Sequence, residues 1–202
     1  MDCLGNLGAV YQARQNWHRA KRRFQQALKL ISKIDYPAGK IGLKINLGYT
    51  FMLTGKHEQA LAMQDTAVSA ARTHGNPDLL LRALAGRGDT WQHHGRLTEA
   101  QNDYAEAIDL VESISGDLKE ESDHISYFGA GKPTLYRRLV HLLALKQYYP
   151  AEALYYVECG RSRAFIELLT QSLPRIDIQE YEDKMPLTYA KITHLLGEED
   201  GG

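Results

Sequence analysis

The sequence repeats itself with a period of 40 residues, and this period restricts the fold more than any other feature. Glycine recurs at Gly8, Gly48 and Gly88, and an aromatic residue follows three positions later each time. The same register aligns three columns of small or aliphatic residues, which are Ala20/Ala60/Ala100, Ala27/Ala67/Ala107 and Leu28/Val68/Ile108. Periods of about 20–50 residues are typical of stacked repeats, in which each unit buries its apolar face against its neighbours.

Each repeat is predicted to contain two helices. In the first repeat, Ala20, Phe24 and Ala27 share one stripe of an amphipathic helix. Thr54-Gly55 and His94-Gly95 indicate helix ends, because glycine accepts the left-handed conformation of a C-cap. Asn76-Pro77-Asp78 indicates a helix start, in which asparagine caps free amides and proline fits the first turn. The pattern therefore predicts an all-α fold.

The repeat resembles the tetratricopeptide repeat (TPR), whose usual length is about 34 residues. The matching residues are Leu7, Gly8, Tyr11, Ala20, Phe24 and Ala27. Units of 40 residues are similar to those of the spindle-orientation adaptors with GoLoco motifs, of kinesin light chain and of proteins with a CHAT domain (caspase-like, HetF-associated with TPRs). The resemblance implies a right-handed superhelix of antiparallel helix pairs, with three regular repeats and one atypical pair.

Three segments are predicted along the chain. Residues 1–115 hold the three regular repeats, residues 116–171 an atypical helix pair, and residues 172–202 a short helix with a flexible acidic tail. In the atypical pair, an apolar stripe defines the first helix, and the second runs from Ala153 to Leu169. The stripe consists of Leu135, Leu139, Leu142 and Leu143.

The atypical pair has a resemblance of its own. Together with Tyr136, the run from Glu158 to Leu169 is similar to the stretch that joins TPR arrays to CHAT domains. The catalytic His and Cys of that family have no matching positions here. The resemblance implies that Glu158, Arg161 and Arg163 dock a following domain; the alternative is a solvated helix surface, on which Glu158 and Arg161 pair weakly.

In TPR proteins the first helix of each pair lines the concave surface, which takes extended or helical peptides. Asn6 and Asn46 are equivalent, and the resemblance to the GoLoco adaptors and kinesin light chain implies that such an asparagine contacts the peptide backbone. In the third repeat Gly86 replaces it. The alternative is that both asparagines face solvent or stabilise the neighbouring pair. The candidate partner-binding residues are Asn6, Gln12, Asn46, Tyr49, Met52, Arg82, Asp89 and Gln92.

Charge and composition disfavour several other functions. The 24 basic and 25 acidic residues leave a net charge of −1, so we expect no attraction to nucleic acid or to anionic membranes. Cys3 and Cys159 are the two cysteines, and the histidines lack metal-ligand spacing. We find no phosphate loop or nucleophile motif. We therefore expect no enzyme activity, no cofactor and no metal.

The remaining expectations concern location and partners. The N-terminus has no signal-peptide pattern and no apolar run is long enough to span a membrane, so we expect a cytoplasmic protein. The first hypothesis is a scaffold or adaptor that binds a protein or peptide on the concave surface. The alternative is the regulatory TPR portion of a CHAT-type cysteine protease whose catalytic domain is absent from this chain. Self-association through the ends of the array is a third possibility.

Overall fold

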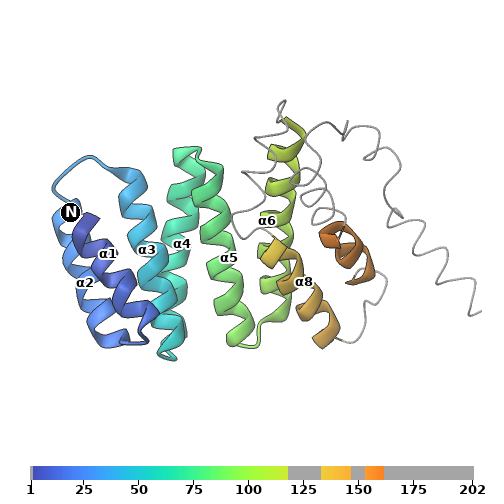
Figure 1. Cartoon of the computed structure of the whole chain (residues 1–202), viewed down its shortest axis with the longest axis horizontal. Coiled ribbons are helices and arrows are strands. Elements are labelled where there is room, and N and C mark those ends of the chain that lie inside the picture. Colours follow the sequence, from blue (N-terminus) through green and yellow to red (C-terminus); the bar gives the residue numbers. More distant parts are fainter. Residues whose placement is uncertain (1, 118–132, 147–152, 162–202) are drawn as a thin grey trace, which may run out of the picture. The chain divides into compact units, whose positions relative to one another are not determined.

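Helices make up the secondary structure of the part of the chain that the computed structural model describes, residues 2–117, 133–146 and 153–161 (Figure 1). This confirms the all-α prediction. The helices are α1 (Asp2–Ala13), α2 (Trp17–Ile31), α3 (Pro37–Leu53), α4 (His57–His74), α5 (Pro77–His93), α6 (Leu97–Asp117) and α8 (Pro133–Lys146). Residues 153–161 are also helical.

The chain divides into two compact units, Met1–Ala107 and Ile108–Gly202, and the division falls within α6. In the first unit, α1 pairs with α2, and α3 pairs with α4. Successive pairs are joined by the packing of α2 on α3 and of α4 on α5. The first helices also contact one another, α1 with α3 and α3 with α5. The predicted helix pairs are therefore present in this unit.

One turn geometry joins the two helices of each repeat. In each repeat the residue before the second helix donates its backbone N–H to the carbonyl of the recurring aromatic residue. The three bonds are Asn16 to Tyr11 at 2.8 Å, Lys56 to Phe51 at 2.9 Å and Arg96 to Trp91 at 2.9 Å. The residue before that donor has a positive φ, 72° at Gly55 and 78° at Gly95, which confirms the predicted C-caps. In the first repeat the same position holds Gln15, at φ 56°.

Replacing Gln15 with glycine is therefore expected to stabilise the protein by about 0.5–1 kcal/mol, because a side chain strains the left-handed conformation that the turn requires. The opposite change, Gly55→Ala, is expected to destabilise it by about 1 kcal/mol for the same reason. Urea denaturation followed by circular dichroism measures both. A Gln15→Gly variant no more stable than the wild type would show that Gln15 is not strained.

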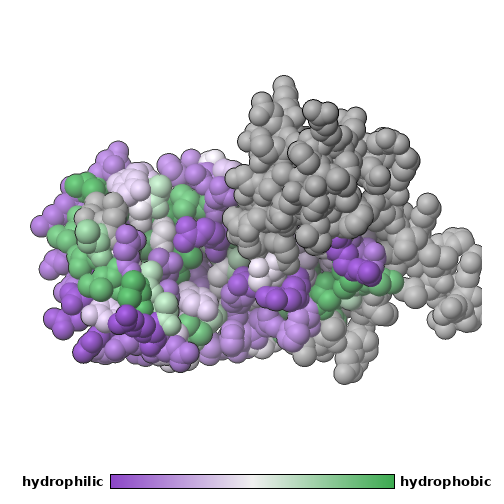
Figure 2. Space-filling model, in the orientation of Figure 1, coloured by the Kyte–Doolittle hydropathy of each residue, from purple (hydrophilic) through white to green (hydrophobic). Residues whose placement is uncertain are grey.

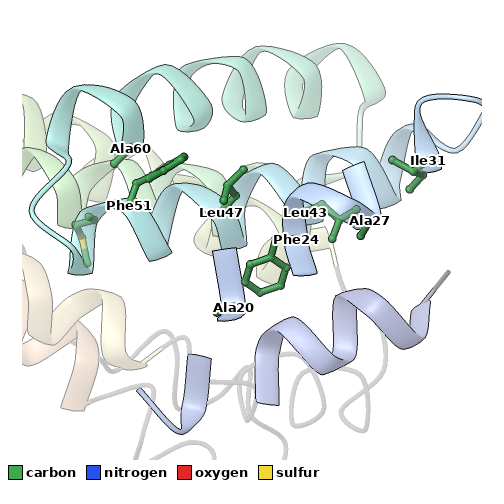
Figure 3. Packing of buried hydrophobic residues seen from close by; sticks show 9 residues of the cluster. Ala20, Phe24, Ala27, Ile31, Leu43, Leu47, Phe51 and Ala60 are labelled. Carbon is green, nitrogen blue, oxygen red and sulfur yellow. The ribbon is translucent and has the colours of Figure 1, made fainter. Parts of the chain in front are cut away.

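The core of the first unit contains residues of α2, α3 and the start of α4. Figure 3 shows Phe24 of α2 and Phe51 of α3 within one apolar cluster. Both are almost inaccessible to solvent, as are the small residues Ala20 and Ala27 beside Phe24. The clustered residues are Ala20, Phe24, Ala27, Ile31, Leu43, Leu47, Phe51, Met52 and Ala60.

The glycine column sets how closely the helices of a pair approach. A Cβ atom added at Gly8 would lie 2.5 Å from the ring of Phe24, and one at Gly88 would lie 2.6 Å from the ring of Tyr104. At Gly48 the nearest atom is the Cγ of Gln64, at 2.8 Å. Each glycine thus faces the residue 16 positions later, and only a glycine leaves room for that side chain.

In the second unit, the predicted stripe of α8 is buried: Leu135, Leu139, Leu142 and Leu143 are at most 3 % exposed. Tyr136 donates a hydrogen bond to Glu112 of α6. A Cβ atom at Gly160 would lie 3.2 Å from Tyr136, so the helix at residues 153–161 packs on α8. The predicted continuation of this helix to Leu169 and the predicted tail at residues 172–202 lie outside the described residues.

Candidate functional site

The candidate site lies on one face of α1, α3 and α5, which we call the first-helix face. It holds the predicted partner-binding residues, which are Asn6 and Gln12 of α1, Asn46, Tyr49 and Met52 of α3, and Arg82, Asp89 and Gln92 of α5. All of them except Arg82 occupy equivalent positions in successive repeats: the register of 40 residues aligns Asn6 with Asn46, Tyr49 with Asp89, and Gln12 with Met52 and Gln92. The contacts of α3 with α1 and α5 bring the three surfaces together.

Four of these residues have side chains that are available to a partner. Asn6 and Arg82 are exposed, Asn46 is half-buried, and Tyr49 is 38 % exposed. None of the four side chains forms a hydrogen bond or an ion pair within the described residues. An unpaired amide can both donate and accept, and a guanidinium offers several donors. The polar groups on this part of the face thus have no hydrogen-bond partner within the described residues.

Gln12 and Met52 instead serve the packing of the repeats. The Nε2 of Gln12 donates to the carbonyl of Asn46 at 3.2 Å and to the Oγ1 of Thr50 at 3.0 Å. Thr50 donates in turn to the same Asn46 carbonyl at 2.8 Å. Gln12 therefore ties α1 to α3. Met52 is only 5 % exposed and belongs to the core cluster.

Asp89 and Gln92 hold a buried tyrosine. The hydroxyl of Tyr104, whose side chain is fully buried, lies 2.7 Å from Oδ1 of Asp89 and 3.1 Å from Oε1 of Gln92. A hydroxyl has one proton, and the shorter contact to a carboxylate identifies Asp89 as its main acceptor. These two residues therefore support the first-helix face from within the third repeat.

Gly42 leaves space on the face between the polar residues. A Cβ atom added at Gly42 would meet nothing within 4 Å, so there is space on α3 one turn before Asn46. The carbonyl of Gly86, which replaces the asparagine in the third repeat, accepts two hydrogen bonds, as the carbonyl of Asn46 does. Nε2 of Gln64 donates to the Gly86 carbonyl at 2.9 Å and Oγ1 of Thr90 at 3.2 Å.

A charged cluster around Arg87 of α5 contains none of the predicted partner-binding residues. Arg87 donates two hydrogen bonds to Asp103, at 2.7 and 2.8 Å, and one to Asp65 at 2.9 Å. Asp103 is 4 % exposed. The sequence does contain a signal for this cluster: Arg87 stands where the other repeats have Leu7 and Leu47. A charge in a core column requires a buried partner.

Within this cluster, the charges of Arg87 and Asp103 depend on each other. The hydrogen bonds to Asp103 raise the pKa of Arg87 above its usual range. Burial raises the pKa of Asp103, and the hydrogen bonds from Arg87 act in the opposite direction. The carboxylate of Asp103 therefore relies on Arg87 to remain ionised in a poorly solvated place.

The possible domain-docking residues lie partly outside the described residues. Arg161 donates to Glu158 at 3.2 Å, three residues earlier on the same helix, which is the pairing that the spacing predicts. The side chain of Arg161 is 75 % exposed, so this pair is weak. Arg163 is not described.

Metal-binding clusters and membrane spans are both missing from the described ranges. Among residues 2–117, 133–146 and 153–161, no three His, Cys, Asp or Glu side chains gather in a way that could hold a metal ion. Every helix in the same ranges is too short or too polar to cross a bilayer.

Comparison with known proteins identifies the repeat type. The tetratricopeptide repeat family matches residues 1–34, which include α1 and α2. RapI in its apo form has a similar structure, with a TM-score of 0.66 and 18 % identity over 90 % of this chain. The fold is that of tetratricopeptide repeats. The TPR fold generally serves protein–protein interaction.

Other TPR-like structures are also similar, at lower scores. BtubC from P. vanneervenii has a TM-score of 0.51 and 11 % identity, over 84 % of this chain and 74 % of its own. A candidate kinesin light chain from Podosopora anserina, with nearly identical TPR-like repeats, has a TM-score of 0.51 and 12 % identity, over 90 % of this chain and 96 % of its own. The chain spans 58 % of the RapI chain. No curated protein matches the sequence.

Proposed function

We propose that this TPR protein is an interaction module that binds a peptide or protein segment across the first-helix face, and that it acts by binding rather than by catalysis. One observation carries the proposal. Asn6, Asn46, Tyr49 and Arg82 lie on this face with their polar groups unpaired within the described residues, whereas Gln12 on the same face is bonded internally.

The four residues suit different parts of a bound segment. The amides of Asn6 and Asn46 can pair with both the N–H and the C=O of an extended backbone, which gives affinity without side-chain specificity. Tyr49 offers a large, partly exposed ring as an anchor for an apolar residue. The guanidinium of Arg82 can pair with a carboxylate. We therefore propose a partner segment with one apolar and one acidic side chain.

The other candidates take supporting roles in this proposal. Gln12 fixes the spacing of α1 and α3, and Met52 belongs to the core of the same unit. Asp89 and Gln92 hold Tyr104. Rigid support of this kind lowers the ordering cost that a partner must overcome on binding.

Changing Asn46 and Tyr49 together to alanine is expected to weaken partner binding by at least about tenfold, since anchor residues near the centre of an interface contribute most of its affinity. The test is affinity capture from native lysate with mass spectrometry, followed by titration of the partner against both proteins. Circular dichroism checks that the variant is folded. The matched control changes Gln25 and Gln59, which are exposed on α2 and α4, to alanine.

The result that supports the proposal is a partner lost by the Asn46/Tyr49 variant and retained by the Gln25/Gln59 control. Equal retention by both folded variants would place binding elsewhere and would contradict the proposal. Loss in both would show that capture depends on general surface properties.

A second proposal is that the chain is the regulatory TPR portion of a CHAT-type cysteine protease. It is supported by the sequence resemblance of residues 158–169 and by the packing of the helix at residues 153–161 on Tyr136. The length of the parent reading frame tests it. A downstream caspase-like domain with a His and Cys dyad would favour the protease, and a stop codon directly after Gly202 would contradict it.

A further inference from the structure

Basic residues are concentrated in one part of the chain. Ten of the 24 basic residues and one of the 25 acidic residues, Asp35, lie between positions 14 and 56. The net charge of −1, from which we expected no attraction to anionic membranes, therefore averages a basic segment with an acidic remainder. The ten basic residues are Arg14, Arg19, Lys21, Arg22, Arg23, Lys29, Lys33, Lys40, Lys44 and Lys56.

The loop between α2 and α3 lies within this basic segment. It spans residues 32–36, whereas α4 and α5 are joined by residues 75–76 alone. Figure 1 shows this loop at the ends of the helices in the first unit. Two backbone hydrogen bonds of 3.2 Å, donated by Lys33 and Ile34, hold its first turn to α2. We call residues 32–36 the α2–α3 loop.

Two large apolar side chains of the α2–α3 loop are exposed to solvent. Ile34 and Tyr36 are each 45 % exposed. The ring of Tyr36 lies over Gly39, because a Cβ atom added there would be 2.5 Å from the ring and 2.7 Å from Ile31. The ring is therefore supported by protein and still half exposed. Figure 2 shows apolar surface among hydrophilic residues at the upper left, where Figure 1 places this loop.

Lysines flank the two apolar residues. Lys29 and Lys33 precede Ile34 and are exposed, and Lys40 is half-buried in the first turn of α3. None of the three ammonium groups forms an ion pair or a hydrogen bond within the part of the chain that the structure describes. Asp35 is the one acidic residue of the loop. The α2–α3 loop thus combines unpaired positive charge with exposed apolar surface.

We propose that the α2–α3 loop, with Lys29 and Lys40 beside it, binds the surface of an anionic lipid bilayer. Charge complementarity selects an anionic partner, because lysines are attracted to the negative headgroups of such a surface. The exposed Ile34 and Tyr36 favour a bilayer over an acidic polypeptide. An isoleucine side chain can enter the acyl boundary, while a tyrosine ring and lysine ammonium groups remain at the level of the headgroups.

The position of the loop suits a flat surface. Because it joins the ends of two helices, a bilayer can reach its lysines and its apolar side chains together. Attachment is expected to be weak and reversible, since a single isoleucine buries less apolar surface than a lipid anchor does. The proposed partner site lies along α1, α3 and α5, so the two proposals concern different surfaces and either can fail alone.

Co-sedimentation of the 202-residue chain with phospholipid vesicles tests the proposal. We expect binding to phosphatidylcholine vesicles that contain about 30 % phosphatidylserine, and at least about tenfold weaker binding to pure phosphatidylcholine. Raising the salt concentration from about 0.1 M to about 0.5 M should release the protein, because salt screens the lysine charges. Immobilised poly-glutamate probes the alternative of an acidic polypeptide.

Matched variants separate this loop from general surface charge. Changing Lys29 and Lys33 to glutamine should weaken vesicle binding about 10–30-fold, at about fivefold for each lysine. Ile34→Ser should weaken it by about threefold to tenfold. The control changes Arg14 and Lys56 to glutamine, which removes the same charge from exposed turns at the opposite ends of α2 and α3, and should bind nearly as the wild type does. Circular dichroism checks that each variant is folded.

Vesicle binding that needs both the two lysines and Ile34 supports the proposal. No binding to the phosphatidylserine vesicles would overturn it. Equal weakening by the Arg14/Lys56 control would also overturn it, by showing that overall charge rather than this loop is responsible. Binding to poly-glutamate that is as tight as binding to the vesicles, and unchanged by Ile34→Ser, would identify an acidic polypeptide as the partner instead.

Discussion

Replacing Arg87 with leucine is expected to destabilise the protein by about 3 kcal/mol, although Leu7 and Leu47 are the residues that the other repeats carry at this position. The change removes the two hydrogen bonds that Asp103 receives, at 2.7 and 2.8 Å. It leaves a carboxylate that is 4 % exposed without its counter-charge. Urea denaturation at pH 7, followed by circular dichroism, measures the loss.

The double variant Arg87→Leu, Asp103→Met is the matched control. It reproduces the pair Leu47 and Met63 of the second repeat, so both charges leave together. We expect it to recover most of the lost stability, because an apolar pair of suitable size can replace a buried ion pair at little cost. Asp65 then loses its contact as well, but its side chain is 55 % exposed and remains solvated.

The pH dependence of the single variant gives a further check. Burial raises the pKa of Asp103, and the contributions that lower this pKa come from the hydrogen bonds and the charge of Arg87. The Arg87→Leu change removes them. A carboxyl group with a folded pKa above its unfolded value of about 3.9 costs stability that grows as pH rises above that value. The deficit of Arg87→Leu should therefore be smaller at about pH 4.5 than at pH 7. An equal deficit at both pH values would indicate lost packing rather than an unpaired charge.

Changing Gly88 to alanine is expected to destabilise the protein by about 2 kcal/mol. Its Cβ atom would lie 2.6 Å from the ring of Tyr104, which is fully buried and whose hydroxyl is held by Asp89. The ring cannot move aside without losing that hydrogen bond, so the overpacking cost of about 1–3 kcal/mol outweighs the better helix propensity of alanine.

Gly42→Ala provides the matched comparison. Gly42 also lies inside a helix, but a Cβ atom there would meet nothing within 4 Å. At this position only the higher helix propensity of alanine affects stability, and the variant should be more stable than the wild type by about 0.5–1 kcal/mol. Thermal unfolding of the two variants beside the wild type separates the effects. Stabilisation by both alanines would show that the glycine column does not set the helix spacing.

Much of the fold could be predicted from the sequence, because residues that recur every 40 positions show which parts of the repeats are equivalent. Gly8 and Gly88 align with each other and face the rings of Phe24 and Tyr104, as close helix packing requires. The ends of helices could also be predicted from the sequence. Gly55 and Gly95 adopt the left-handed conformation, and the side chain of Asn76, at the start of α5, accepts a hydrogen bond from the amide of Leu79 at 3.0 Å. These features are local, and their chemistry allows few alternatives.

The site was less predictable because a helical pattern identifies a face but not the neighbours of each side chain. Gln12 and Asn6 share the face, yet only Gln12 is bonded to α3. Met52 lies at a level equivalent to Gln12 and is buried. The ion pair of Arg87 depends on Asp103, 16 residues later on another helix. Such contacts depend on the packing between helices, which a period of 40 residues does not specify.

Hydrogen exchange of the chain with and without a captured partner, read by mass spectrometry, tests the central claim most directly. A partner bound across the first-helix face should slow exchange in α1 and α3 around Asn6 and Asn46 and in α5 around Arg82, because binding there stabilises those helices against opening. Exchange on the exposed parts of α2 and α4 should change much less. Protection confined to α2 and α4, or to residues 153–161, would contradict the assignment of the first-helix face as the binding surface.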